Sequence, residues 1–194
     1  MVVEHVAQGS LRDGVTTSSG SALPLTPKQV IAQQVAEALA YLHDEQIVHD
    51  RLTAFSVLLD EHWCAKLGIF AIFHHVRLSP LDDESCSYAA PEVRMGQQST
   101  EKADVDAFGV LLVELDTPES PAANHRRRSP PSDSSETKTG DGVSTMDSSQ
   151  GITLSHRCPP KMKDLITACL EPDAARRPSM RQVVQALSAS AMAM

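Results

Sequence analysis

The run ADVDAFGVLLVEL, residues 103–115, is apolar on nearly every side. A helix with apolar residues all round leaves no face for water, so it must lie at the centre of a protein or inside a membrane. No apolar stretch in the chain approaches the length of about 18 residues that a membrane-spanning helix needs. We therefore predict a central buried helix in a chain whose 194 residues are enough for one domain with a core.

Three further helices are predicted from apolar residues that recur at helical spacing. The first begins near Thr26, which can cap it, and Pro27, which suits the first helical position. It is expected to have about four turns, with an apolar stripe of Ile31, Val35, Ala38 and Leu42. The last two helices follow Pro159-Pro160 and Pro178, and their stripes are Met162, Leu165, Ile166 and Cys169, then Met180, Val183, Val184 and Leu187.

Two short apolar runs, Val57-Leu58-Leu59 and Ala65-Lys66-Leu67, flank the polar stretch DEHWC. Short apolar runs joined by a polar turn predict a two-stranded hairpin. The expected fold is therefore mainly α with one short β-hairpin.

The composition changes over residues 117–151. From 117 to 150 there is no Leu, Ile, Phe, Tyr or Trp, while Ser, Thr and Pro are frequent. Such a segment cannot bury enough apolar surface to offset the entropy lost on ordering, so we predict a disordered insertion between residues 1–116 and 152–190. Within it, RRRSPP suggests a kinase substrate site at Ser129, although a solvated linker explains the same residues.

Charge and cysteine content restrict the class of protein. The net charge is -8, from 25 acidic and 17 basic residues, which argues against binding to nucleic acid or to an anionic membrane. The four cysteines form no C-x-x-C pair, and no secretory signal opens the chain. We expect free thiols and a cytoplasmic location. His74 and His75 are adjacent and have no third ligand at a suitable spacing, so we expect no metal site.

Several short motifs occur in a fixed order. His49-Asp50-Arg51-Leu52, with Ser56 four positions later, precedes Ile69-Phe70-Ala71 and then Ala90-Pro91-Glu92. The central run follows, and EPDAARRPSM leads into the last helix. In this order and spacing they resemble the large lobe of a protein kinase, whose signatures are H-R-D-L-x-x-x-N, D-F-G and A-P-E. The residues in and around these motifs are most similar to those of the tyrosine-kinase-like serine/threonine group.

The opening residues VVEHVAQGSL resemble the hinge that joins the two lobes of a kinase. The resemblance places Glu4, Val6 and Leu58 beside an adenine ring. It also implies that the chain begins where a small lobe would have ended, so we expect the small lobe and its glycine-rich phosphate loop to be absent.

The resemblance implies that phosphate chemistry is lost. Arg51 occupies the position of the acid that accepts the substrate proton, and a guanidinium cannot act as a base. Ile69 and Ser56 occupy the positions of the two Mg²⁺ ligands, although Mg²⁺ requires hard oxygen ligands. Thr53 replaces a lysine that contacts the transferred phosphate. Asp50, one position from Arg51, could act as the base only if its side chain reached the same place.

Positions that support the lobe are retained. The resemblance implies a buried ion pair between Glu92 and Arg177. It also implies that Asp104 accepts hydrogen bonds from the backbone of the catalytic loop, and that His49 and Phe70 belong to a hydrophobic stack.

The hypothesis favoured by this contrast is a catalytically inactive pseudokinase that serves as a binding or scaffolding module. We then expect no cofactor, and a protein partner that binds the surface left by the missing small lobe. The alternative is a divergent serine/threonine kinase, encoded by a truncated reading frame, that uses ATP and Mg²⁺ with Asp50 as its base.

Overall fold

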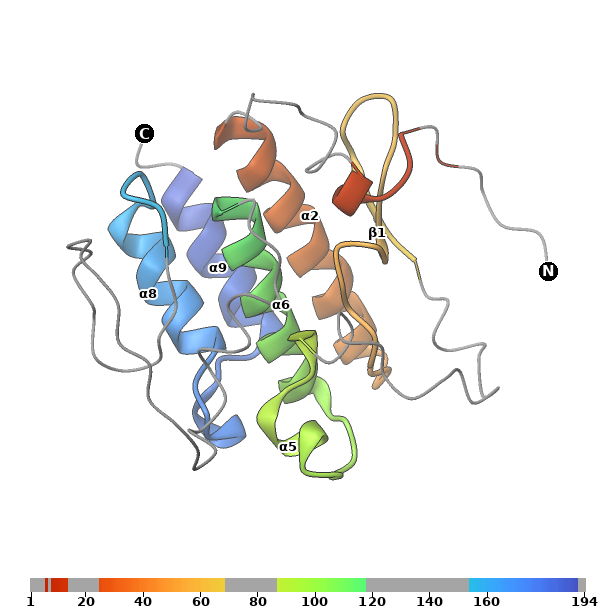
Figure 1. Ribbon diagram of the computed structural model, residues 1–194, viewed down its shortest axis with the longest axis vertical. Coiled ribbons are helices and arrows are strands. Elements are labelled where there is room, and N and C mark those ends of the chain that lie inside the picture. Colours follow the sequence, from red (N-terminus) through yellow and green to blue (C-terminus); the bar gives the residue numbers. More distant parts are fainter. Residues whose placement is uncertain (1–5, 7, 14–24, 69–86, 118–153, 192–194) are drawn as a thin grey trace, which may run out of the picture.

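The computed structural model of the protein describes residues 6, 8–13, 25–68, 87–117 and 154–191 (Figure 1). Its helices and strands, in chain order, are α2 (Leu25–Asp44), β1 (Val57–Leu59), β2 (Ala65–Leu67), α5 (Pro91–Arg94), α6 (Glu101–Asp116), α8 (Pro160–Cys169), the 3₁₀ turn η1 (Ala174–Arg176) and α9 (Met180–Ala191). The described part of the chain is therefore rich in helix and contains one two-stranded sheet, as predicted.

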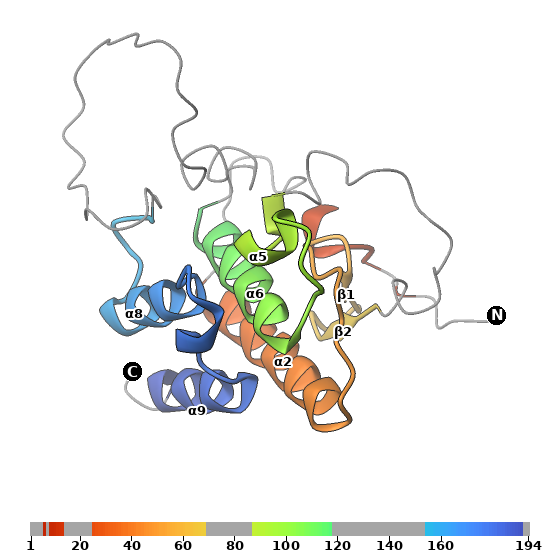
Figure 2. The same ribbon diagram turned by 90° about the horizontal axis from the view of Figure 1, so that it is seen from below.

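Helix α6 is the predicted central helix. Every residue from Ala103 to Leu115 is buried, so no face of its middle reaches water. It packs against α2 on one side and α8 on the other, while α9 packs against both α2 and α8. In Figures 1 and 2 the hairpin lies on the opposite side of α2 and α6 from α8.

Helix α2 differs in detail from the prediction. The helix begins at Leu25. Thr26 therefore lies inside the helix and is not the capping residue before it, and Pro27 is in the first turn but is not the first helical residue. Ala38 and Leu42 are only half-buried. The buried face instead consists of Ile31, Ala32, Val35, Ala36 and Leu39. This face is wider than a single stripe because α2 packs against α6, α9 and β2 together.

The predicted hairpin is confirmed. Strands β1 and β2 are antiparallel, with Val57 opposite Leu67 and Leu59 opposite Ala65. The other edge of β1 is paired with residues 8–10. The N–H of Leu59 donates to the Gly9 carbonyl at 2.9 Å, and the Leu59 carbonyl accepts the N–H of Gln8 at 3.1 Å. Backbone pairing thus fixes the opening segment against the strand that follows the loop at residues 49–56.

The two C-terminal helices also match the prediction. In α8, Ile166 and Cys169 are fully buried, and Met162 and Leu165 pack at the edge of the core. In α9, Met180, Val183 and Leu187 are buried.

Other predictions fall on residues outside the described ranges. These include the insertion with Ser129, the motif Ile69-Phe70-Ala71, and Glu4. Among the described helices, none is both long and apolar enough to cross a bilayer. The described cysteines Cys64, Cys158 and Cys169 form no disulfide.

Gly109 lies where α6 approaches the end of α8. A Cβ atom added to Gly109 would lie 2.7 Å from Cδ2 and 2.8 Å from Cγ of Leu170, which is itself buried. We expect Gly109→Ala to lower the free energy of unfolding by about 1–2 kcal/mol, because overpacking costs about 1–3 kcal/mol and alanine's better helix propensity returns at most about 1 kcal/mol.

Urea unfolding of Gly109→Ala measures this effect. Because the clash is with Leu170, the cost should shrink when the same substitution is made in a Leu170→Ala background. An equal cost in both backgrounds would contradict the packing explanation.

Candidate functional site

The loop at residues 49–56, between α2 and β1, is fixed by one buried carboxylate. Asp104 lies in the first turn of α6 and is 2% exposed. Its Oδ2 accepts the N–H of His49 at 2.8 Å, and its Oδ1 accepts the N–H of Asp50 at 2.9 Å. Nε2 of His43, at the end of α2, lies 2.9 Å from Oδ2. Asp104 therefore joins α6, α2 and the loop, which is the arrangement that the sequence resemblance implies.

Asp50 has a left-handed backbone conformation, with φ of 66°. Aspartate adopts this region more readily than most residues, because its short polar side chain bonds locally. The side chains of Asp50 and Arg51 are both exposed. No hydrogen bond or ion pair joins them to another described residue, so neither charge is neutralised within the described part of the chain.

His49 is a packed histidine, 1% exposed. Its Nε2 lies 3.0 Å from the carbonyl oxygen of Gly68, which can only accept, so Nε2 carries the ring proton. Burial lowers the pKa of His49, and this outweighs the opposing hydrogen bond to Gly68 and the charge of Asp104. The ring is therefore neutral near pH 7 and holds the loop against the end of β2.

Ser56 closes a turn within the loop. Its Oγ donates to the carbonyl of Thr53 at 2.9 Å and accepts the N–H of Thr53 at 3.0 Å. The Ser56 carbonyl accepts the N–H of Gly68 at 2.7 Å. The first two contacts use the hydroxyl to shape the loop, and its oxygen is the one side-chain oxygen that position 56 could offer to a cation.

A second buried polar group, the hydroxyl of Tyr88, also supports the loop. The hydroxyl of Tyr88 accepts the N–H of Ala54 at 3.2 Å and donates to Oε2 of Glu114. Oε1 of Glu114 is paired with the guanidinium of Arg12. Burial, followed by the charge of Glu114, raises the pKa of Tyr88 far above its ordinary value, so the phenol stays protonated. The pairing links the helical turn at 11–13, the loop and α6.

Sequence reasoning missed Tyr88, Glu114, Arg12 and His43. One signal was present for Glu114, because it is one of three carboxylates in a run that must be buried on all sides, and a buried charge needs a partner. The identity of that partner could not be read from the sequence, since Arg12 and Glu114 are 102 residues apart.

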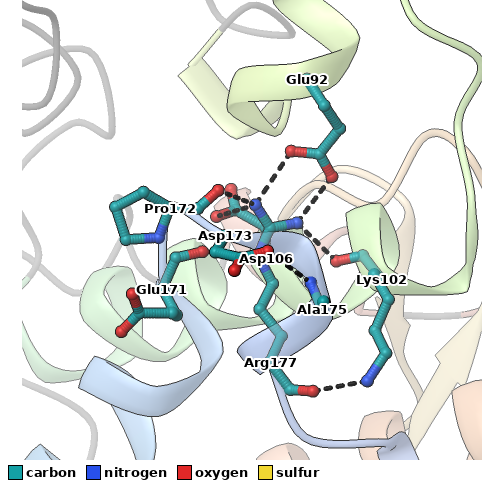
Figure 3. A network of polar contacts seen from close by, with 8 residues as sticks. All are labelled: Glu92, Lys102, Asp106, Glu171, Pro172, Asp173, Ala175 and Arg177. Carbon is teal, nitrogen blue, oxygen red and sulfur yellow. Dashed lines mark hydrogen bonds and ion pairs between the residues drawn. The ribbon is translucent and has the colours of Figure 1, made fainter.

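Arg177, just after η1, lies at the centre of a network of polar contacts (Figure 3). It is 2% exposed and forms a two-pronged pair with Glu92, at 2.7 and 2.9 Å. Its other N–H groups donate to the carbonyls of Lys102, Glu171 and Pro172. All five guanidinium donors are thereby used, and α5, α6 and η1 are fixed to one another.

A cavity of about 160 Å³ lies beside the loop. It is bounded by residues 50–53, by residues 88–90 and Val93, by Ser99, and by the α6 residues Ala103, Asp104 and Ala107. Of the sequence-predicted site residues, Asp50, Arg51 and Thr53 reach this cavity together. Leu58 is half-buried in β1, and Val6 accepts the N–H of Gly9 at 3.4 Å.

Metal binding needs several ligands within reach of one ion. Among the residues that the structure describes, no group of three His, Cys, Asp or Glu side chains could hold a metal ion. Ile69 lies outside those residues, so the predicted loss of the metal site stays a prediction.

Together, a helical domain, a short hairpin and a loop tied to an aspartate of the central helix define the class of a protein-kinase-like domain. The chain belongs to the protein tyrosine and serine/threonine kinase family, whose profile it matches over residues 1–187. This match supports the assignment to the kinase superfamily and its tyrosine-kinase-like group that was made from the sequence.

Plant receptor-like kinases are among its relatives. The chain is 32% identical to calmodulin-binding receptor-like cytoplasmic kinase 2 of Arabidopsis thaliana, over 96% of the chain and 49% of that protein. It is 31% identical to a probable leucine-rich repeat receptor-like protein kinase of the same plant, over 96% of the chain and 21% of the relative. A probable serine/threonine-protein kinase of Dictyostelium discoideum is 29% identical, over 95% and 17%. The chain spans half or less of these relatives' length.

Proposed function

We propose that this kinase-family domain is a pseudokinase: a binding or scaffolding module for a protein partner, without phosphotransferase activity. The observation that carries the proposal is the contrast within the loop at 49–56. Its backbone is held as a family member requires, by Asp104, while Arg51 presents an exposed cation where an acid would accept a proton. A guanidinium stays protonated at every physiological pH and cannot serve as a base.

The positions for Mg²⁺ support the same proposal. Phosphoryl transfer depends on metal ions that bridge and neutralise the phosphates. Position 69 is isoleucine, which offers no oxygen, and the hydroxyl of Ser56 is used within its own turn. Because positioning and charge neutralisation supply most of the catalysis in this reaction, losing both ligands should remove more activity than losing the base alone.

A divergent active kinase is the second candidate, and one observation favours it. Asp50 is exposed and borders the same cavity as Arg51, so an acidic residue lies next to the position of the base. Asp50 has a left-handed backbone conformation, with φ of 66°, and Arg51 does not. The two side chains are therefore not interchangeable in position, and a misplacement of a catalytic group by about 1 Å can cost about 10²-fold in rate.

Radiolabelled phosphate transfer from ATP to a generic protein substrate, or to the chain itself, tests the proposal. We expect no transfer above background from the natural chain. The double variant Asp50→Arg, Arg51→Asp restores the order H-R-D, and it should also be inactive, because positions 56 and 69 still lack metal ligands. Activity of the natural chain that disappears in Asp50→Asn would establish the second candidate instead.

The place of action and the partner are part of the proposal. The relative named as a cytoplasmic kinase supports a cytoplasmic location. The partner surface predicted from the sequence, which is the surface left by a missing small lobe, stays a prediction.

A further inference from the structure

Among the acidic residues that the structure describes, Asp106 is the most deeply buried. It lies on the central helix α6, and 0% of its surface is exposed. Moving an ionised carboxylate out of water is so unfavourable that a buried carboxyl group either bonds closely to a cation or keeps its proton. The neighbours of Asp106 decide which of these two states the folded domain favours.

The guanidinium of Arg177 faces Asp106 but is bonded more closely to Glu92 (Figure 3). Nη2 of Arg177 lies 3.8 Å from Oδ1 of Asp106, an ion-pair contact that is longer than a hydrogen bond. The five N–H donors of Arg177 go to both carboxylate oxygens of Glu92 and to three backbone carbonyls. One buried guanidinium therefore faces two carboxyl groups, and its charge is already balanced by the two-pronged bond to Glu92.

The side chains next to Asp106 on α6 and α8 do not favour its ionised form. On α8, burial and then the charge of Asp106 raise the pKa of Cys169 to about 12, so this thiol keeps its proton and carries no charge. On α6, Lys102 directs its ammonium group to the backbone carbonyl of Arg177. Charges beside η1 are at least partly exposed, and water screens them: Arg176, Glu171 and Asp173.

We propose that Asp106 keeps its proton at neutral pH in the folded domain, so that the stability of the domain falls as the pH rises. With this proton, Arg177, Glu92 and Asp106 together carry no net charge. Without it, one negative charge is left over in the core, and Asp106 competes with Glu92 for Arg177. The inference goes beyond the proposed function, because it concerns the folding of the domain whatever the domain binds.

The direction of the pH effect follows from counting protons. In the unfolded chain an aspartate loses its proton above about pH 4. Above that pH, unfolding releases the proton that Asp106 holds, and the equilibrium constant for unfolding rises about tenfold for each pH unit. The stabilisation is complete below about pH 4 and is lost by the pH at which Asp106 ionises in the folded domain.

Urea unfolding of the natural chain and of Asp106→Asn between pH 5 and pH 7 tests the proposal. Asparagine has nearly the shape of the neutral acid and cannot ionise. We expect the unfolding constant of the natural chain, divided by that of the variant, to rise about tenfold for each pH unit. The ratio cancels the titration of groups that both chains share, including His43 and His49. A ratio that stays constant or falls as the pH rises means that Asp106 is ionised, and it overturns the inference.

Asp44→Asn is the matched control, because the Asp44 side chain is 40% exposed and pairs with Arg181 at the surface. Its ratio to the natural chain should stay constant over the same pH range. Carboxyl ¹³C NMR of the uniformly labelled natural chain reads the Asp106 proton directly and does not require that Asp106→Asn folds. We expect the Asp106 carboxyl signal at the position of the neutral acid at pH 7, and a signal at the carboxylate position overturns the inference.

Discussion

Replacement of Arg177 by methionine is expected to lower the free energy of unfolding by about 3–5 kcal/mol, the usual cost of removing one partner of a buried ion pair. Glu92 would lose both hydrogen bonds, at 2.7 and 2.9 Å, and its side chain is only 12% exposed. Carbonyls of Lys102, Glu171 and Pro172 would lose their donor too. Methionine keeps much of the side-chain volume, so the loss reports bonding more than packing.

Arg176→Met is the matched control for this prediction. Arg176 is the preceding residue, its side chain is 74% exposed, and its ion pairs with Glu171 and Asp173 are 3.9 and 3.8 Å long. Exposed pairs contribute little, so we expect a change of no more than about 0.5 kcal/mol. Urea unfolding of the two variants measures both values, and similar losses would contradict the role given to Arg177.

Asp104→Ala is expected to cost about 2–4 kcal/mol and to release the loop at 49–56. The N–H groups of His49 and Asp50 would lose their acceptor, and an unsatisfied buried donor costs about 1–3 kcal/mol. Water entering from the neighbouring cavity should recover part of this cost. Amide hydrogen exchange at residues 49 and 50 should accelerate by more than exchange in α8, which would show that the loop opens locally.

Asp44→Ala provides the comparison for Asp104. Asp44 is the last residue of α2 and, unlike Asp104, forms an exposed pair, in which the Arg181 side chain is 72% exposed. The unfolding free energy and the exchange of the loop should stay nearly unchanged. Equal acceleration across the whole chain in Asp104→Ala would mean that the carboxylate supports the domain as a whole and has no special part in holding the loop.

Sequence patterns were sufficient where one physical requirement determined the structure. The run at residues 103–115 had to be buried because it has no polar face, and α6 is buried over that length. Apolar runs around DEHWC gave the hairpin, and stripes behind prolines gave α8 and α9. The buried pair of Glu92 and Arg177 was expected only from the resemblance of the ordered motifs to protein kinases. Spacing alone does not say which of many charges meet.

Patterns failed where several neighbours act on one residue. The buried face of α2 turns toward Ala32 and Ala36 because α6, α9 and β2 all contact the helix, and a single stripe cannot encode three partners. Tyr88 meets Glu114 only after residues far apart in the chain have folded together. The left-handed conformation of Asp50 occurs together with a hydrogen bond from its N–H to Asp104, and this bond is likewise a product of the tertiary fold.

Two calorimetric titrations of the chain with ATP, one in the presence of Mg²⁺ and one with a chelator instead of Mg²⁺, test the central claim most directly. The claim is that the loop keeps the architecture of a kinase without the oxygen ligands that hold a divalent cation. We predict no binding heat that depends on magnesium. Magnesium-dependent heat that is lost in Ser56→Ala would contradict it, because the hydroxyl now assigned to the loop turn would then be a metal ligand.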